Sequence, residues 1–373
     1  MAAEAEELLV LSCVPGVGPA RLRSLVGHFG TAAAVARASP RALAAVAGID
    51  RKTASKIASY FRGNIAPAQR FAADQLARLD RLGGRLISFR DADYPPLLNA
   101  IFDPPPFLFF RGTLDAADRT AIALVGTRNP TPYGTSMAQR FAEGFAGLGI
   151  PVVSGLARGI DTIAHAASLR AGNRTLAVIG SGLDVLYPPE NASLAGRIVE
   201  HGALFSEYPL GTKPDAVNFP RRNRIVSGMT LGTLVIETGT DGGAMITASL
   251  AADQGREVFA VPSAAGGRRP SGTNLLIKEG KAKLTESIDD ILAELAPALK
   301  AVMPAADARR PPPPPTLTLF EQQLVERLGD EPVHIDTLAA MTGFTVPDAL
   351  VHLLGLEFKG IVRQHAGKMF VRS

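Results

Sequence analysis

The sequence has one cysteine, Cys13, and no tryptophan among its 373 residues. A single thiol excludes an intramolecular disulfide, a Cys-rich zinc site and a cysteine-ligated iron–sulfur cluster, and it is typical of proteins in a reducing cytoplasm. No stretch reaches the roughly 18 consecutive apolar residues that a membrane span requires. The six histidines are scattered, without the spacing of a metal site. The composition predicts a soluble, cytoplasmic protein with no metal and no membrane contact.

Two common nucleotide-binding signatures are also missing. Residues 180–185 lack the third glycine of the dinucleotide fingerprint and follow the third predicted strand, and no Gly-x-x-x-x-Gly-Lys-Ser/Thr motif occurs. No nucleophile with an adjacent base lies near the glycine-rich turns. We therefore expect no cofactor and no catalytic residue.

The charge balance is only mildly basic. Lys and Arg total 39 against 35 Asp and Glu, for a formal net charge of +4. This excess permits nucleic-acid binding without demonstrating it, so the placement of the arginines matters more than their sum.

Apolar runs alternate with helical patterns in the middle of the chain, which indicates a parallel sheet covered by helices on both faces. We predict an α/β fold, a Rossmann-like doubly wound parallel sheet, in residues 66–300, with residues 66–120 as an extension packed onto it. The predicted strands are residues 121–126, 152–155, 176–180, 203–208, 233–237 and 258–262.

Smaller modules flank this domain. Residues 1–65 resemble a SAM-like tandem helix-hairpin-helix, whose glycine turns at 14–18 and 47–50 either present amides to DNA phosphates or only join helices of a small bundle. Residues 301–315 form a proline-rich linker, extended as polyproline II at 311–315. Residues 316–373 predict a winged helix. Its third helix offers only Lys359 as a base, which favours a protein-contact role.

Glycine-rich or arginine-bearing turns follow the predicted strands. Backbone N–H groups and the helix dipole can hold an anion where a strand ends and a helix begins. Arg128 comes directly after the first strand, and Gly126 allows a ligand to approach closely, so we expect Arg128 to bind phosphate. Turns of the same kind occur at residues 154–159 and 239–243, the second leading to Thr247.

Residues 219–224, Phe-Pro-Arg-Arg-Asn-Arg, favour a nucleic acid over a mononucleotide. An aromatic ring beside a basic cluster can stack a base while arginines hold the backbone. The alternative is a core phenylalanine before a helix with solvated arginines.

Three acidic or titratable residues allow more than one interpretation. Asp161 and His165 are four residues apart on a predicted helix, as a metal or acid–base pair would be, although a structural pairing is favoured because no third ligand is evident. Glu237 ends a strand and could orient a ribose or an arginine, or act as a catalyst.

These segments together resemble the DNA-processing protein A family, also called DprA or Smf. The matching stretches are 125–128 with 133–134, 154–161 with 164–165, 178–184 with 187–188, 206–208, 219–225, 242–244 and 271–274. The resemblance covers roughly residues 85–295, and the flanking modules resemble the accessory domains of the family.

The resemblance implies a protein without catalytic turnover that binds and protects single-stranded DNA taken up in natural transformation and loads a RecA-type recombinase onto it. It implies a homodimer, and a single-strand binding protein is a further candidate partner. Family members often carry a lysine three residues before the phenylalanine, where this chain has Ala216; Lys213 is the nearest lysine. The predicted nucleic-acid site comprises Gly126, Thr127, Arg128, Ser154, Gly155, Arg158, Gly159, Lys213, Phe219, Arg221, Arg222, Asn223, Arg224, Gly242, Gly243 and Thr247.

Two other functions remain open at this point. The same fold occurs in nucleotide-hydrolysing proteins, although their Gly-Gly-x-Gly-Thr turn differs from the one in this chain. A protein-binding adaptor is the third hypothesis. It is supported by the excess of acidic over basic residues in the last predicted helix.

Overall fold

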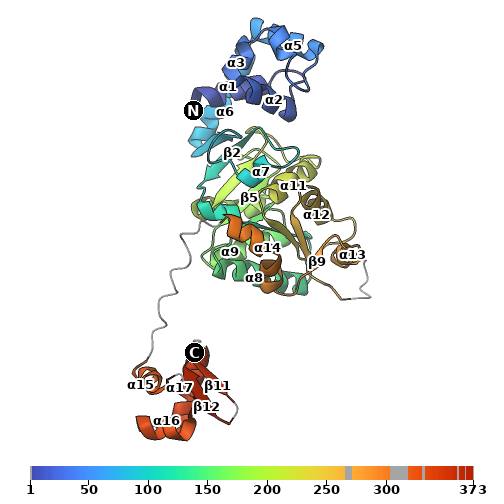
Figure 1. Cartoon of the computed structure of the whole chain (residues 1–373). Coiled ribbons are helices and arrows are strands. Elements are labelled where there is room, and N and C mark those ends of the chain that lie inside the picture. Colours follow the sequence, from blue (N-terminus) through green and yellow to red (C-terminus); the bar gives the residue numbers. More distant parts are fainter. Residues whose placement is uncertain are drawn as a thin grey trace. The chain divides into compact units, whose positions relative to one another are not determined.

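A computed structural model describes residues 2–264, 271–302, 318–329, 332–358, 361–365 and 367–372. The chain forms two compact units, Met1–Met303 and Pro304–Ser373 (Figure 1). Each unit has its own hydrophobic core and is described by itself.

The first unit is built on a nine-stranded sheet with the order β1-β2-β6-β5-β4-β3-β7-β8-β9. From β6 to β9 all neighbouring strands pair in parallel. The inner strands are short and completely buried, as expected where helices cover both faces. The strands are β1 (Gly84–Ser88), β2 (Phe107–Gly112), β3 (Ile122–Val125), β4 (Val152–Ser154), β5 (Thr175–Ile179), β6 (Ala203–Ser206), β7 (Gly232–Val235), β8 (Glu257–Ala260) and β9 (Lys283–Leu284).

Helices cover the two faces of this sheet. One face packs against α8 (Pro132–Gly147), α9 (Ile160–Arg170) and α14 (Ile288–Val302), and the other against α7 (Pro96–Asn99), α11 (Asn218–Gly228) and α12 (Gly243–Asp253). The connections also contain η1 (Ala116–Thr120), η2 (Pro189–Asn191), α10 (Ala192–His201) and α13 (Gly272–Lys278). The predicted doubly wound α/β fold is confirmed.

One edge of the sheet differs from the prediction. β1 and β2 pair antiparallel, and β2 pairs antiparallel with β6, so residues 66–120 contribute strands to the sheet in addition to packing on it. Because prolines 95–96 and 104–106 interrupt this segment, the sequence suggested only an extension packed onto the domain. The apolar run Phe107 to Phe110 is nevertheless buried. It lies in β2, which pairs with the edge of β6 that the parallel strands leave open.

The N-terminal helices pack into the same unit. Arg21 donates from Nε to the Gly48 carbonyl at 3.2 Å and from a terminal nitrogen to the Gly16 carbonyl at 2.8 Å, so one side chain joins the two glycine turns. The long helix α6 packs against both α1 and β1. The helices are α1 (Ala2–Ser12), α2 (Pro19–Phe29), α3 (Ala32–Arg37), α4 (Pro40–Leu43), α5 (Arg51–Arg62) and α6 (Ala66–Arg81).

The second unit is a winged helix, as predicted. Its strands form a three-stranded sheet in the order β10-β12-β11, and its helices pack around Leu353 and Phe370. The elements are α15 (Leu319–Arg327), β10 (Val333–His334), α16 (Ile335–Thr342), α17 (Val346–Phe358), β11 (Val362–His365) and β12 (Met369–Arg372). The polyproline prediction at 311–315 and Lys359 lie outside the described residues.

Candidate nucleic-acid interface

A cleft of about 680 Å³ opens at the carboxyl edge of the sheet. The chain runs outward from β3 through β4, β5 and β6 and then returns to β7 on the other side of β3, so the strand order reverses between β3 and β7. Loops diverge at such a point and leave a crevice, which is where open α/β sheets bind ligands. The turns after β3, β4, β6 and β7 all contribute to its lining.

The turn after β3 is fixed on both sides. Thr127 donates its N–H to the Glu237 carbonyl at 2.7 Å, and its own carbonyl accepts from Ile160 N at 3.1 Å. A Cβ on Gly126 would lie 2.6 Å from the Ile160 side chain and 2.9 Å from the Glu237 carbonyl, so only glycine fits. These contacts hold the backbone that carries Arg128 in one place.

The Glu237 carboxylate holds the loop after this turn through hydrogen bonds to Thr131. Its Oε2 accepts from Thr131 N at 3.0 Å and from Thr131 Oγ1 at 2.9 Å, and Thr131 caps the start of α8. This contact is none of the roles that the sequence left open for Glu237: the carboxylate orients the loop that follows Arg128, through Thr131.

Arg128 lies over an aromatic pair. Its guanidinium carbon is 5.6 Å from the centre of the Phe219 ring, and Phe219 and Tyr187 are tilted against each other with centroids 5.8 Å apart. Phe219 packs on Gly180, where a Cβ would be 3.1 Å from the ring. Arg128 is exposed, and among the described residues no carboxylate forms an ion pair with it. The cleft thus combines a free cation with two rings.

Arg222 also lines the cleft but is buried, with 4% of its surface exposed. It donates to the Gly155 carbonyl at 2.7 Å, while its Nε has no partner among the described residues. Burial lowers the pKa of Arg222 to about 10, against the opposing effect of the Asp161 carboxylate, so the group is charged at neutral pH. This cation lies at the base of the cleft.

Asp161 is the counter-charge of Arg222. A Cβ on Gly155 would lie 2.5 Å from the Arg222 guanidinium and 2.8 Å from Asp161 Oδ2. Both charged groups therefore lie next to Gly155. The same Oδ2 accepts N–H bonds from Gly155 and Ala157 at 3.2 Å each. Burial raises the pKa of Asp161, and the Arg222 charge acts against this shift.

His165 is buried one helical turn after Asp161 and makes a structural contact. Its Nδ1 lies 2.7 Å from Thr175 Oγ1, which itself donates to the Val152 carbonyl at 2.8 Å. The hydroxyl therefore accepts from an Nδ1–H. Burial lowers the pKa of His165 to about 3, so it stays neutral. The described residues hold no cluster of three or more metal-ligating side chains. Asp161 and His165 have different hydrogen-bond partners, and among the described residues no hydrogen bond joins one to the other, so the favoured pairing of the two is not observed.

The far wall of the cleft is the start of α12. Gly242 is its N-cap, and a Cβ there would be 2.1 Å from Thr238 Oγ1, whereas a Cβ on Gly243 would meet nothing within 4 Å. Asn223 donates to the Gly243 carbonyl at 3.4 Å and so joins α11 to α12. The first N–H groups of a helix have no intrahelical partner and attract anions.

The structure brings most, but not all, of the predicted residues together. Those that line the cleft are Gly126, Thr127, Arg128, Gly155, Phe219, Arg222, Asn223, Gly242, Gly243 and Thr247; those that do not are Ser154, Arg158, Gly159, Lys213, Arg221 and Arg224.

Four of the residues outside the lining, Ser154, Arg158, Gly159 and Arg224, make close contacts within the protein. The Ser154 hydroxyl is buried and donates to the Leu124 carbonyl at 2.7 Å, and Arg158 pairs with Glu190. Gly159 supports the turn, with a φ of +77° and no room for a Cβ beside the Thr127 carbonyl.

Arg224 is likewise engaged elsewhere, with ion pairs to Glu207 at 2.6 Å and Asp103 at 3.2 Å. Helical periodicity explains the split, because Arg222 and Arg224 point about 200° apart on one helix. Lys213 and Arg221 are exposed near the lining segments 214–223, and their contact with DNA stays a prediction.

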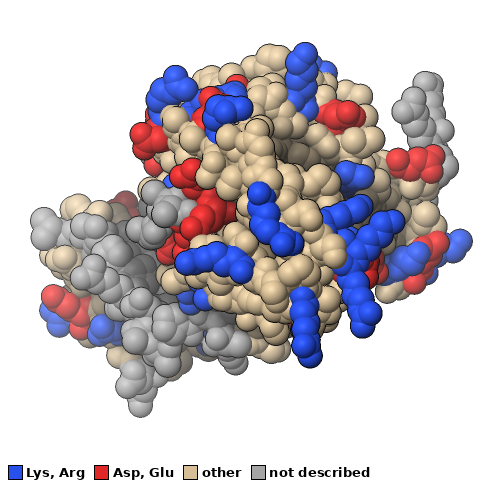
Figure 2. Space-filling model, turned by 90° about the horizontal axis from the view of Figure 1, so that it is seen from above, with Lys and Arg blue, Asp and Glu red and all other residues tan. Residues whose placement is uncertain are grey.

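Sequence reasoning missed several lining residues, among them Tyr187, Pro214 and Ile246. Tyr187 and Ile246 are 37% and 42% exposed, although both are large and hydrophobic. Their only signal was position near a glycine-rich turn, and their direction depends on loop geometry. On the face that Figure 2 presents, a group of Lys and Arg side chains lies at the right, and acidic side chains lie both among the basic ones and elsewhere.

Comparisons with known proteins identify the family of each part of the chain. Residues 85–296 match the family model of DNA recombination-mediator protein A, residues 308–368 match the DprA winged helix domain, and residues 7–62 match the SAM-like helix-hairpin-helix tandem. Protein Smf of Synechocystis sp. is 34% identical, with 98% of each chain covered.

Two solved structures are also similar. DNA processing protein A of Streptococcus pneumoniae is 32% identical with a TM-score of 0.66, covering 79% of this chain and 98% of that one. The Helicobacter pylori protein, whose structure concerns its single-stranded DNA binding mode, is 27% identical with a TM-score of 0.52, covering 58% and 96%. None of the described helices is long and apolar enough to cross a membrane. The chain belongs to the DNA recombination-mediator protein A family, known as DprA or Smf.

Proposed function

We propose that this protein binds single-stranded DNA in the cleft between β3 and β7, protects it, and loads a RecA-type recombinase onto it during natural transformation. One observation carries the proposal: the unpaired Arg128 lies over the Phe219 ring, which contacts Tyr187, in a cleft that the buried cation of Arg222 also lines. Base stacking on rings and cations along the backbone are how sequence-independent single-strand binders work.

A single strand fits this cleft better than a duplex does. Stacking on Phe219 requires an unpaired base, because the faces of a paired base are covered by its neighbours in the helix. Lys213 and Arg221, both exposed beside the lining segment, would extend the cationic path along the strand. Family membership and the DNA ligand of the Helicobacter pylori relative support the same substrate.

The first experiment measures the anisotropy of a labelled single-stranded oligonucleotide and of its duplex across a salt series. The variants are Arg128→Ala and, as a matched control, Arg170→Ala, an exposed arginine that pairs with Glu143 between α8 and α9. We expect Arg128→Ala to weaken single-strand binding about tenfold or more, since a charged hydrogen bond contributes about 1.5–3 kcal/mol.

The salt dependence gives an independent readout. The slope of log affinity against log salt should fall by about 0.7 for each phosphate that the Arg128→Ala variant no longer neutralises, and it should not change in Arg170→Ala. A salt-insensitive affinity, or equal binding by wild type and Arg128→Ala, would contradict the proposal.

The proposal includes no catalytic turnover. Glu237 is not part of the cleft lining and accepts hydrogen bonds from Thr131, while Asp161 accepts them from backbone amides, so both carboxylates have structural contacts. Incubation with nucleoside monophosphates should release no base. Detected release would favour the nucleotide-hydrolysing alternative instead.

The partners follow from the mediator role. We propose a homodimer that acts in the cytoplasm with a RecA-type recombinase, with a single-strand binding protein as a further partner on the same strand. The assay is nucleation of the recombinase on a strand coated with single-strand binding protein, with and without this protein. Deleting residues 316–373 tests the adaptor hypothesis, which expects loading to be lost while DNA affinity remains.

A further inference from the structure

We infer that helix α6, through Gln75 and Arg78, positions the two loops that form the Tyr187 side of the cleft. The loops are residues 180–188, after β5, and residues 207–217, after β6. The inference rests on the proposed function and adds positioning residues to it, outside the cleft and on the helix that joins the N-terminal module to the sheet.

Gln75 holds the second loop by its backbone. It donates from Nε2 to the Leu210 carbonyl at 3.3 Å, and its Oε1 accepts the Leu210 N–H at 2.7 Å. One carboxamide thus pairs with both polar groups of a residue 135 positions away, as a neighbouring strand would. Gln75 is 2% exposed and Leu210 is 4% exposed, so water cannot easily replace these bonds.

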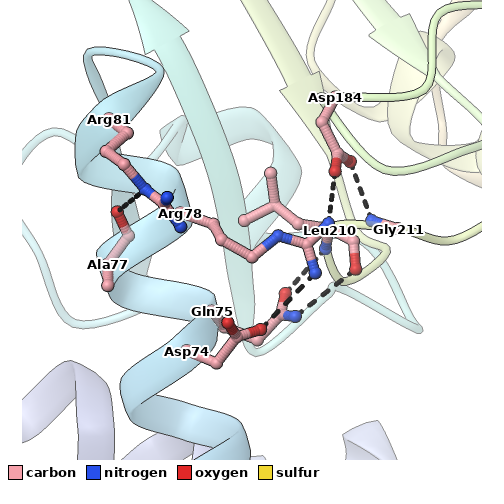
Figure 3. A network of polar contacts seen from close by, with 8 residues as sticks. All are labelled: Asp74, Gln75, Ala77, Arg78, Arg81, Asp184, Leu210 and Gly211. Atoms are coloured by element: carbon pink, nitrogen blue, oxygen red, sulfur yellow. Dashed lines mark hydrogen bonds and ion pairs between the residues drawn. The ribbon is translucent and has the colours of Figure 1, made fainter.

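Arg78, one turn further along α6, reaches the first loop. It forms an ion pair with Asp184 at 2.5 Å, and the other carboxylate oxygen of Asp184 accepts the Gly211 N–H at 2.7 Å. Figure 3 shows the two sets of contacts side by side, with α6 on one side and Asp184, Leu210 and Gly211 on the other. Asp184 therefore links α6 to both loops.

The loops are also joined to each other without α6. Gly182 donates its N–H to the Thr212 carbonyl at 3.0 Å, and a Cβ on Gly182 would lie 2.7 Å from the Pro209 carbonyl. Both loops enter the cleft a few residues beyond this junction, at Tyr187 and at Pro214. A shift of the junction would therefore move both side chains.

The same helix follows directly on the N-terminal module and is in contact with it. α6 packs against both α1 and β1, and its Gln75 and Arg78 bond to the loops. The position of the cleft wall is thus set by a helix outside the nucleotide-binding fold. This assigns the module a role in DNA affinity that requires no DNA contact of its own.

The test uses three single variants of the full-length protein: Gln75→Ala, Arg78→Ala and Asp184→Asn. Asp184→Asn keeps an acceptor for Gly211 N–H and loses only the charge opposite Arg78. The matched control is Arg81→Ala, because Arg81 lies on the same helix and its Nε bonds only to the Ala77 carbonyl of its own turn.

Two readouts separate positioning from general stability. The first, which needs no DNA, is hydrogen exchange of peptides covering residues 207–217, which should speed up in Gln75→Ala and Arg78→Ala. The second is single-strand affinity, which should weaken about threefold to tenfold, as expected when one or two loop-ordering hydrogen bonds are removed. Asp184→Asn should weaken it less, and Arg81→Ala should match wild type in both.

These measurements distinguish failure of the positioning role of α6 from failure of the proposed DNA binding. If wild type binds single strands and Arg128→Ala does not, but Gln75→Ala and Arg78→Ala bind normally with unchanged exchange, the positioning role is wrong. Faster exchange throughout the protein in Gln75→Ala, with normal exchange and affinity in Arg78→Ala and Asp184→Asn, would also overturn it. If wild type does not bind, the proposed function fails, while the exchange measurement still tests the junction.

Discussion

Replacing Arg222 by methionine should destabilise the protein as well as impair DNA binding. Methionine fills a similar space, but it leaves the Gly155 carbonyl without its 2.7 Å donor and the buried Asp161 without its counter-charge. Leaving a buried charge without a nearby counter-charge costs about 3–5 kcal/mol. For a unit of this size each kcal/mol lowers Tm by about 2–4 °C, so Tm should fall by roughly 10 °C.

The assay is thermal unfolding of wild type, Arg222→Met and the double variant Arg222→Met/Asp161→Asn. Asparagine can still accept the Gly155 and Ala157 N–H bonds but carries no charge, so the double variant should recover about 1–3 kcal/mol.

The pH dependence of Arg222→Met provides a further check. Burial already raises the pKa of Asp161, and loss of Arg222 removes the effect that opposes this shift. A raised folded-state pKa means that stability is kept at low pH and lost as pH rises, so the deficit should be larger at pH 8 than at pH 5. A Tm within one or two degrees of wild type at pH 8 would refute the buried-pair reasoning.

Two further predictions concern the supports of the cleft. Gly159→Ala should lower Tm and weaken single-strand binding more than Gly172→Ala does, because both have φ near +75° but only Gly159 lacks room for a Cβ, 2.4 Å from the Thr127 carbonyl; equal effects would show that the close approach is unimportant. His165 has a folded-state pKa of about 3 against 6.5 when unfolded, so it favours folding fully above pH 6.5 and less as pH falls. Urea unfolding should show a loss of about 2 kcal/mol between pH 7 and pH 5 that His165→Gln reduces, and an equally steep profile in the variant would contradict this.

The sequence predicted the parallel part of the sheet well because the inner strands are short, mostly apolar runs, and β3, β4 and β5 are each followed by a glycine turn. That pattern arises only where both faces are covered. The sequence did not predict β1 and β2, because a proline-rich connection separates them and because the pairing of β2 with β6 depends on which edge of the sheet remains open. The turns after the strands were also predictable, since the ends of parallel strands share one edge.

Within those turns the direction of each side chain was not predictable. Arg222 and Arg224 are two residues apart with the same chemistry, yet one lies at the base of the cleft and the other pairs with Glu207. Arg158 had the same apparent role as Arg128, but only Arg158 meets a carboxylate, on a segment 32 residues away.

The sequence by itself determined the fold class, the edge of the sheet where the cleft opens, and the glycine-rich turns that line it, because these depend on local periodicity and on glycine geometry. The tertiary structure alone decided which cations are free, which ring lies beneath Arg128, and that α6 holds two cleft loops through Gln75 and Arg78. The reason is physical: the partner of a charge or a buried amide is selected by long-range packing, which no local pattern of residues encodes.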